Sequence, residues 1–195
     1  MKILRAADRA ATPWKNGLGI TREIAAHPLG AGLDDFDWRL SMASVDAGGP
    51  FSSFPGVDRV LAVLEGRLTL TIDGAAPIAL DPDTPPLAFP GDVPVEADLL
   101  AGPVTDLNLM TRRGQVNGTL ERINLTAPIE LDLPPTTLIL SLTGDVGLVH
   151  ARSRYTLGVY DAARLALAAV GSVRIEPNRP SALYVIRLTV LARRE

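Results

Sequence analysis

Polar side chains that could hold a small charged ligand gather in four short clusters within the first 114 residues. The first cluster, TPWKNGLGITRE at residues 12–23, brings Lys15, Asn16 and Arg22 together with a tryptophan and two glycines. A lysine or arginine can bind a carboxylate, and a glycine lets the backbone approach a ligand closely. The same residues would also suit an ordered N-terminal loop with Trp14 in the core, so composition alone leaves both interpretations open.

The second cluster, FDWRLSMASV at residues 36–45, alternates in the manner of a β-strand. Arg39 and Ser41 fall on one face, and Trp38 and Leu40 fall on the other, because successive side chains of a strand point to opposite sides. On an isolated strand the polar face would be solvated. In a barrel the same face can look into the lumen and mark a ligand cavity.

The third cluster, PFSSFPGVDR at residues 50–59, places Phe51, Phe54 and Arg59 on a turn that enters a strand. These residues can line the mouth of a pocket, where a guanidinium can meet a carboxylate in a two-point contact. A hairpin whose phenylalanines cap the core is an equally good interpretation.

The fourth cluster, GPVTDLNLMTRRG at residues 102–114, alternates again. Asp106 and Asn108 share one face, and Leu107 and Leu109 share the other. If the leucines are buried outside the barrel, the carboxylate and the amide point inward. A buried carboxylate needs a partner, which could be a cation from the other clusters or an amine or amide of a ligand.

Histidine and cysteine are too scarce for most metal centres. The chain has no cysteine and two histidines, His27 and His150, which are far apart in the sequence. Cysteine-based zinc and iron–sulfur sites are therefore excluded. Asp34, Asp35 and Asp37 lie together without the spacing of a calcium loop and indicate a solvated acidic turn. We expect no metal and no cofactor.

Many short apolar or alternating runs, separated by 17 glycines and 16 prolines, predict an all-β protein. Predicted strands include Trp38–Val45, Arg59–Leu64 and Leu68–Ile72, and Asp73-Gly74 predicts a hairpin turn after the last of these. Residues 161–170, DAARLALAAV, favour a helix by propensity. Their shortness and their position among strands indicate a strand or a mixed segment instead.

The polar clusters end near residue 114, and a plainer series of apolar strands follows. This change of character predicts a first barrel with the ligand pocket at residues 1–114. A second, smaller barrel is expected at residues 115–195.

The charge of the chain argues against a polyanionic partner. Its formal net charge is −3 and its isoelectric point is about 5.4, whereas nucleic-acid-binding domains are usually basic. No apolar run reaches the roughly 18 residues that span a bilayer. Arg5, Asp8 and Arg9 interrupt the start, where a signal peptide would be apolar. We expect a cytoplasmic protein with neither nucleic acid nor membrane as partner.

In this order, the motifs TPWKNGLGITREIA, FDWRLSMASV, GPFSSFPGVDRVLAVLEG and GPVTDLNLMTRRG resemble the HutD/Ves family from Thr12 to Gly114. The resemblance implies an RmlC-like cupin with a double (bicupin) β-barrel. It also implies an association with bacterial histidine utilisation or, in the Ves branch, with stress responses, and it attaches no catalytic activity. Metal-dependent cupins carry histidines in both of their motifs, whereas Gly49–Gly66 and the Pro90-Gly91-Asp92 turn contain none. Leu18 stands where a third glycine is common.

Together, the clusters and the resemblance predict a metal-free cupin that binds a small carboxylate as a sensor or regulatory protein, with N-formylglutamate or urocanate as candidate ligands. The residues expected to line the lumen of the first barrel are Lys15, Asn16, Arg22, Arg39, Ser41, Phe51, Phe54, Arg59, Asp106 and Asn108. The alternative is a metal-independent isomerase or hydrolase in which Lys15 or Asp106 acts as acid or base; we favour binding. An interaction module, or a homodimer through sheet edges, is a third hypothesis that the sequence does not decide.

Overall fold

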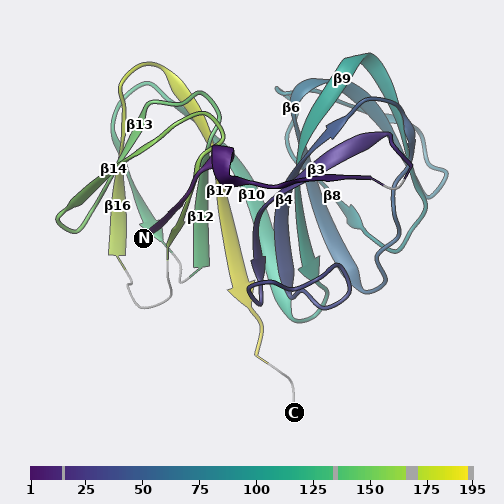
Figure 1. The fold of residues 1–195 in the computed structure, drawn as a ribbon, viewed down its shortest axis with the longest axis horizontal. Helices are drawn as coiled ribbons and strands as arrows, with labels where there is room; N and C mark the ends of the chain where they lie inside the picture. Colours follow the sequence, from purple (N-terminus) through teal and green to yellow (C-terminus); the bar gives the residue numbers. More distant parts are fainter. Residues whose placement is uncertain (15, 134–135, 166–170, 193–195) are drawn as a thin grey trace. The chain divides into compact units, whose positions relative to one another are not determined.

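The computed structural model describes residues 1–14, 16–133, 136–165 and 171–192, and this part of the chain is built from β-strands (Figure 1). Its one helical element is a short 3-10 turn, η1 (Ala6–Asp8). Among the described residues, none belongs to a helix long and apolar enough to cross a membrane. The predicted all-β class is confirmed.

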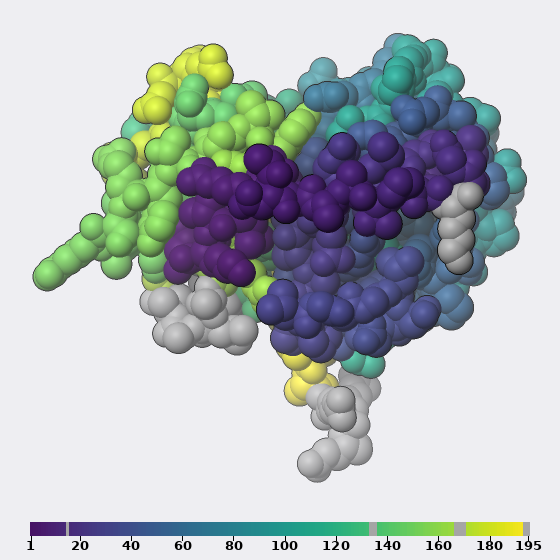
Figure 2. Space-filling model, viewed as in Figure 1, coloured from purple at the N-terminus to yellow at the C-terminus, as the bar shows by residue number. Residues whose placement is uncertain are grey.

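The chain divides into two compact units. The first unit is Ala10–Asn117 with the segment that starts at Leu191, and the second is Met1–Arg9 with Gly118–Val190. The predicted division at residues 1–114 and 115–195 lies close to the observed boundary but assigns the first nine residues differently. They belong to the second unit because β1 (Lys2–Leu4) pairs with β15 (Ala162–Leu165). In Figure 2 these first residues, drawn in purple, lie at the surface.

The first unit is an eight-stranded antiparallel sheet. Its path runs β2-β3-β4-β9-β6-β7, with β5 paired to β9 and β8 paired to β6. The strands are β2 (Ala11–Pro13), β3 (Gly19–His27), β4 (Trp38–Val45), β5 (Gly49–Pro50), β6 (Val57–Ile72), β7 (Ile78–Leu80), β8 (Leu87–Pro90) and β9 (Val95–Arg112). The predicted strand Trp38–Val45 is therefore found with the same bounds.

The long strand β6 joins two segments that the sequence separates. Arg59–Leu64 and Leu68–Ile72 are predicted as two separate strands. In the structure Glu65-Gly66 lies at irregularities in the pairing with β9. Gly66 has φ +82° there, and a Cβ at this position would lie 2.5 Å from the Pro103 carbonyl oxygen. The glycine thus permits a bulge that bends a continuous strand.

The predicted hairpin after β6 is confirmed. Leu68 and Leu70 of β6 pair with Leu80 and Ile78 of β7. The turn residues Asp73 and Gly74 both have positive φ, +50° and +69°. This is the conformation that favours an Asp-Gly pair in a tight hairpin.

Apolar side chains fill part of the interior of the first unit. Leu61 and Val63 of β6 and Val104 of β9 are almost fully buried, and they pack with side chains from the neighbouring strands. Each buried aliphatic side chain contributes about 1.5–3 kcal/mol relative to exposure. This core supports the polar residues that lie on the same sheet.

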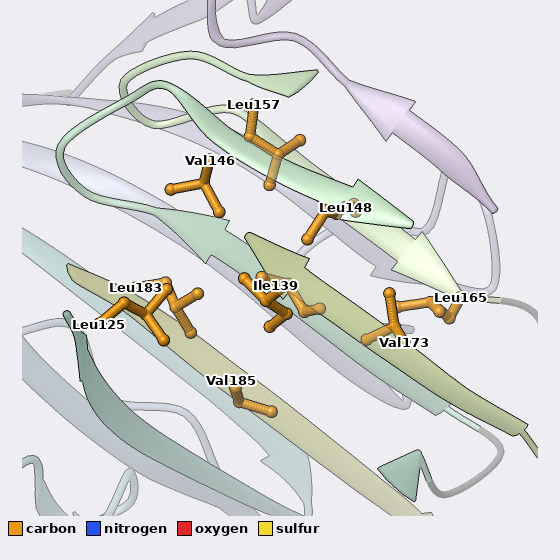
Figure 3. Close-up of a cluster of buried hydrophobic side chains, with 11 residues drawn as sticks. Leu125, Ile139, Val146, Leu148, Leu157, Leu165, Val173, Leu183 and Val185 are labelled. Atoms are coloured by element: carbon orange, nitrogen blue, oxygen red, sulfur yellow. The ribbon is translucent and has the colours of Figure 1, made fainter. Parts of the chain in front are cut away.

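The second unit contains a five-stranded sheet of order β1-β15-β12-β17-β10 and a four-stranded sheet of order β11-β16-β13-β14. The strands not yet bounded are β10 (Val116–Leu125), β11 (Ile129–Leu133), β12 (Thr136–Ser141), β13 (Val146–His150), β14 (Ser153–Leu157), β16 (Gly171–Pro177) and β17 (Ser181–Val190). Residues from both sheets meet in one apolar cluster, with Ile139, Leu148, Val173 and Val185 fully buried (Figure 3).

Residues 162–165 of the helix-like segment 161–170 form a strand in the structure. β15 covers Ala162–Leu165 and pairs with β1 on one side and β12 on the other. Ala162, Ala163 and Leu165 are buried. Pairing and burial therefore override helix propensity here. Residues 166–170 lie outside the described residues.

Candidate functional site

The first unit contains a cavity of about 900 Å³ whose lining is rich in polar groups. Residues from the N-terminal loop, β3, β4, β6, β9 and the connections around them contribute. The polar residues of the lining are Thr12, Asn16, Thr21, Asp34, Arg39, Ser41, Ser52, Ser53, Arg59, Asp106, Asn108 and Arg112. Aromatic side chains accompany them, among them Trp14, Phe51 and Phe54. Such a lining suits a small polar ligand.

The strands β4 and β9 present their polar faces to the cavity. They pair antiparallel with Ser41 opposite Asn108 and Ala43 opposite Asp106. All four residues line the cavity. The intervening Leu107 is fully buried on the opposite face. The predicted alternation on these two strands is therefore found in the structure.

Asp106 is the buried carboxylate of this cavity. Its relative exposure is 2%, and its Oδ1 atom has no hydrogen-bond partner within the protein. Burial raises the pKa of Asp106 to about 7, and the positive charge of Arg59 limits that rise. The group can therefore gain or lose a proton near neutral pH.

Arg59 is the buried cation of the same cavity, and it is enclosed by phenylalanines. Its guanidinium carbon lies 4.8 Å from the ring centroid of Phe51, 5.2 Å from that of Phe89 and 5.8 Å from that of Phe54. These distances suit cation–π contacts. Burial lowers the pKa of Arg59 to about 10, and Asp106 limits the fall. Its Nε has no hydrogen-bond partner within the protein.

The turn after β8 holds Arg59 and its aromatic neighbours in place. The Gly91 amide donates to the Val57 carbonyl at 2.7 Å, and the Phe54 amide donates to the Gly91 carbonyl at 2.7 Å. A Cβ at Gly91 would lie 3.3 Å from Cγ and Cδ of Arg59. A glycine therefore leaves room for the stem of the arginine.

The N-terminal loop contributes an aromatic side chain. The Trp14 indole donates from Nε1 to Oγ1 of Thr21 at 2.7 Å, which fixes the ring beside the cavity. Asn16 also lines the cavity, and its side-chain oxygen accepts a hydrogen bond from the Leu18 amide at 3.1 Å. Lys15, which the sequence singles out in this loop, lies outside the described residues.

Arg39 is a partly buried cation of the cavity. Its Nε donates to Oε2 of Glu23 at 2.9 Å, and its Nη1 donates to Oγ of Ser41 at 3.4 Å. The side chain is 14% exposed. Arg39 also lines the cavity.

Arg112 is a lining residue that the sequence reasoning missed. Its Nη2 donates to the carbonyls of Asp34 at 3.0 Å and Phe36 at 3.2 Å, which ties the connection before β4 to the end of β9. Its guanidinium carbon lies 5.3 Å from the ring centroid of Phe36. The series Asp106, Asn108, Met110 points to it, since the next residue on that face of the strand is Arg112.

Eight of the ten predicted residues line this cavity, namely Asn16, Arg39, Ser41, Phe51, Phe54, Arg59, Asp106 and Asn108. Arg22 does not. Thr21 faces the cavity, so its neighbour Arg22 on β3 points to the other side of the sheet, where its cross-strand partner is Met42. The prediction that Arg22 lines the lumen is therefore wrong for this cavity.

The cavity does not offer the ligands of a cupin metal site. Among the described residues, its lining contains no histidine and no glutamate, the residues that hold the metal in metal-dependent cupins. Within the described residues, no group of three or more His, Asp or Glu side chains is placed to hold a metal ion. His27 stacks on Trp38 and lies 3.8 Å from Asp37, and His150 lies near the Ser172 carbonyl.

Comparison with known sequences links this chain to one family. The HutD family model matches residues 6–184. An uncharacterised 21.2 kDa protein in the hutC 3' region of Pseudomonas putida is 36% identical over 85% of this chain and 86% of its own length. The Ves protein of Citrobacter koseri is 44% identical over 51% of this chain and 52% of its own length.

Solved structures agree with the sequence comparison. HutD from Pseudomonas fluorescens superposes with a TM-score of 0.84 at 31% identity, over 98% of this chain and 99% of that one. A conserved protein of unknown function from Pseudomonas aeruginosa gives 0.89 at 32% identity, over 96% and 97%. A cupin 2 conserved barrel protein from Leptotrichia buccalis, at 10% identity and TM-score 0.63 over 96% of each chain, supports a cupin-like fold.

Proposed function

Because the chain belongs to the HutD family, we propose that the cavity of the first unit binds a small polar carboxylate without a metal, as part of a sensor or regulatory protein of bacterial histidine utilisation. The proposal includes a cytoplasmic location. It also takes each of the two units as a cupin-type barrel, which makes the chain a bicupin.

One observation carries the proposal. Three buried polar atoms that belong to one cavity have no hydrogen-bond partner within the protein: Nε of Arg59, Oδ1 of Asp106 and Oδ1 of Asn108. Leaving a buried polar atom unpaired costs about 1–3 kcal/mol, so proteins rarely keep several together for packing alone. A ligand with both acceptor and donor groups would pair them.

The chemistry of the lining favours a carboxylate that also carries an amide or a ring nitrogen. Guanidinium groups at Arg39 and Arg59 suit the carboxylate, and the oxygens of Asp106 and Asn108 suit an N–H donor. N-formylglutamate and urocanate have this combination, and both are intermediates of histidine breakdown, the pathway that the family resemblance implies.

A second candidate function is a metal-independent isomerase or hydrolase. Asp106 favours it, because a buried carboxyl whose pKa is about 7 can act as a general acid or base at neutral pH. Turnover separates the two candidates. A binding protein returns N-formylglutamate and urocanate unchanged, whereas an enzyme forms product and loses this activity in Asp106→Asn.

A thermal-shift screen of the chelator-treated protein tests the proposed function. The panel holds histidine, urocanate, formiminoglutamate, N-formylglutamate, glutamate and formate. A ligand at about 100 times its Kd adds roughly 2.7 kcal/mol, or about 5–11 °C for a chain of this size. We expect one pathway intermediate to give such a shift, Arg39→Ala to abolish it, and Arg22→Ala to retain it. A shift that survives Arg39→Ala and Asp106→Ala would contradict the proposal.

A further inference from the structure

Arg59 and Asp106 are opposite charges that influence each other without contact. Both side chains are buried, at 5% and 2% exposure, and both line the same cavity. Each also limits the pKa shift that burial causes in the other. Within the described residues, no hydrogen bond joins them and no N···O distance between them is within 4.0 Å. The two charges of a buried ion pair normally touch, because direct contact offsets the free-energy cost of removing each charge from water.

A carboxylate that enters the cavity changes the charge balance at this point. It places a second anion beside Asp106 near one enclosed cation, and two carboxylates that share a site do not both stay ionised. We propose, on the basis of the binding function proposed above, that the ligand's carboxylate replaces Asp106 as the counter-ion of Arg59 and that Asp106 takes up one proton from solvent as the ligand binds. The neutral carboxyl group then donates its O–H to the bound carboxylate.

The charged residues on β3 and β4 do not compete with Arg59 as the cation that pairs with the ligand's carboxylate. Arg39 on β4 already has a carboxylate partner, since Glu23 on β3 lies 2.9 Å from it. The residue of β4 that lies opposite Asp106 is Ala43, which is uncharged. Arg59, which is 5% exposed and lines the cavity, is therefore the buried cation that an anion close to Asp106 can pair with.

The remaining neighbours of Asp106 do not set its protonation either. On β6 the residue opposite Asp106 is Val63, and the next residue on its own face of β9 is the neutral Asn108. Asp34 and Arg112 line the cavity from the connection before β4 and from the end of β9. Neither contributes to the pKa shift of Asp106, whose causes are burial and Arg59.

The titration range of Asp106 fits this exchange of partners. Burial raises its pKa to about 7 while Arg59 limits the rise. When a ligand carboxylate neutralises Arg59, that limit weakens and the pKa rises further. Neither His27 nor His150 is among the described residues that line the cavity.

Isothermal titration calorimetry with N-formylglutamate tests the coupling on the full chain. This probe has two carboxyl groups that titrate near pH 4 and a formylated nitrogen that does not titrate, so only the protein changes charge from about pH 6 to about pH 9. We expect Kd to rise above about pH 7, approaching tenfold per pH unit. Titration in two buffers of different ionisation enthalpy at about pH 8 should count about one proton taken up per ligand.

Two variants separate protonation from ordinary contact. Asp106→Asn keeps the shape of a neutral side chain, so its Kd should not change with pH and its proton count should be zero. Ser41→Ala is the matched control, because Ser41 lines the same cavity and does not titrate. Its Kd should change by the same factor at every pH, with the proton uptake retained.

The proton count on the unmodified chain decides the inference even if a variant fails to fold. Binding at about pH 8 without proton uptake overturns the exchange of partners and leaves the proposed function standing. If neither N-formylglutamate nor formate binds at any of these pH values, both the exchange of partners and the proposed binding function are overturned.

Discussion

Each unit of the chain buries one aspartate, and the two carboxyl groups have opposite environments. In the second unit Asp161 accepts hydrogen bonds from Nη1 of Arg5 at 2.6 Å, from the Ala6 amide at 2.7 Å and from the Gly158 amide at 3.0 Å. Burial alone would raise the pKa of Asp161, but these bonds hold it below its ordinary value. This carboxylate is structural, since it attaches the first residues of the chain to their unit.

In the first unit Asp106 lacks such bonds. Its Oδ1 has no hydrogen-bond partner within the protein, its counter-ion Arg59 does not contact it, and its pKa is raised. The contrast shows that burial does not by itself decide the role of a carboxylate. The satisfied carboxylate stabilises the fold, whereas the unsatisfied one costs stability.

The interiors of the two units also differ, because one of them contains a polar cavity. One cluster of eleven buried apolar side chains lies in the described part of the second unit (Figure 3). The described part of the first unit has apolar clusters of eleven and three buried residues, but it also has a polar cavity of about 900 Å³. We therefore assign recognition to the first unit and stability to the second, and the following predictions test that assignment.

The largest expected effect is a loss of stability from the core of the second unit. Ile139 is fully buried there, so Ile139→Ala should lower the free energy of unfolding by about 2–5 kcal/mol. Denaturant unfolding measures the loss. The Kd for N-formylglutamate should change less than about twofold in the protein that remains folded. A large change in Kd would contradict the separation of roles.

A pH-dependent gain of stability is expected from Asp106→Asn. The folded pKa of about 7 lies above the unfolded value of about 3.9, so the stability that this group contributes is complete below about pH 4 and is lost as pH rises to about 7. The wild-type protein should therefore weaken relative to Asp106→Asn by up to about 1.4 kcal/mol per pH unit over this range. Unfolding at about pH 4.5, 6 and 8 measures the difference. A constant difference would rule out a raised pKa.

The opposite sign is expected from Asp161→Asn. The lowered pKa of Asp161 means that its contribution to stability is complete above the unfolded pKa and is lost as pH falls through the folded one. The variant turns an N–H₂ group toward backbone and arginine donors and should cost about 2 kcal/mol at neutral pH. The same unfolding series should show this cost shrinking below about pH 4. A cost that grew on acidification would contradict the hydrogen-bonded carboxylate.

Local alternation was enough to predict much of the candidate site. Arg39, Ser41, Asp106 and Asn108 lie on the predicted faces because β4 and β9 are regular where they meet. Arg22 is predicted to line the cavity as well, but the structure places its neighbour Thr21 there instead. Arg112 could have been found by extending the alternation of β9 by two residues.

Long-range pairing could not be derived from the sequence. Phe89, the third ring beside Arg59, comes from β8, and only the register of β6 with β8 places Phe89 opposite Arg59. The first nine residues join the second unit through pairing between residues more than 150 positions apart. No local pattern reports such contacts, because they depend on which strand edges meet after folding.

The most direct test of the central claim is a crystal structure of the protein with N-formylglutamate, grown near pH 6 where Asp106 is mostly protonated. We predict that the ligand lies in the cavity of the first unit, with one carboxylate within hydrogen-bond distance of both the Arg59 guanidinium and the Asp106 carboxyl group. A ligand ordered in the second unit, or in the cavity but away from Arg59 and Asp106, would contradict the account.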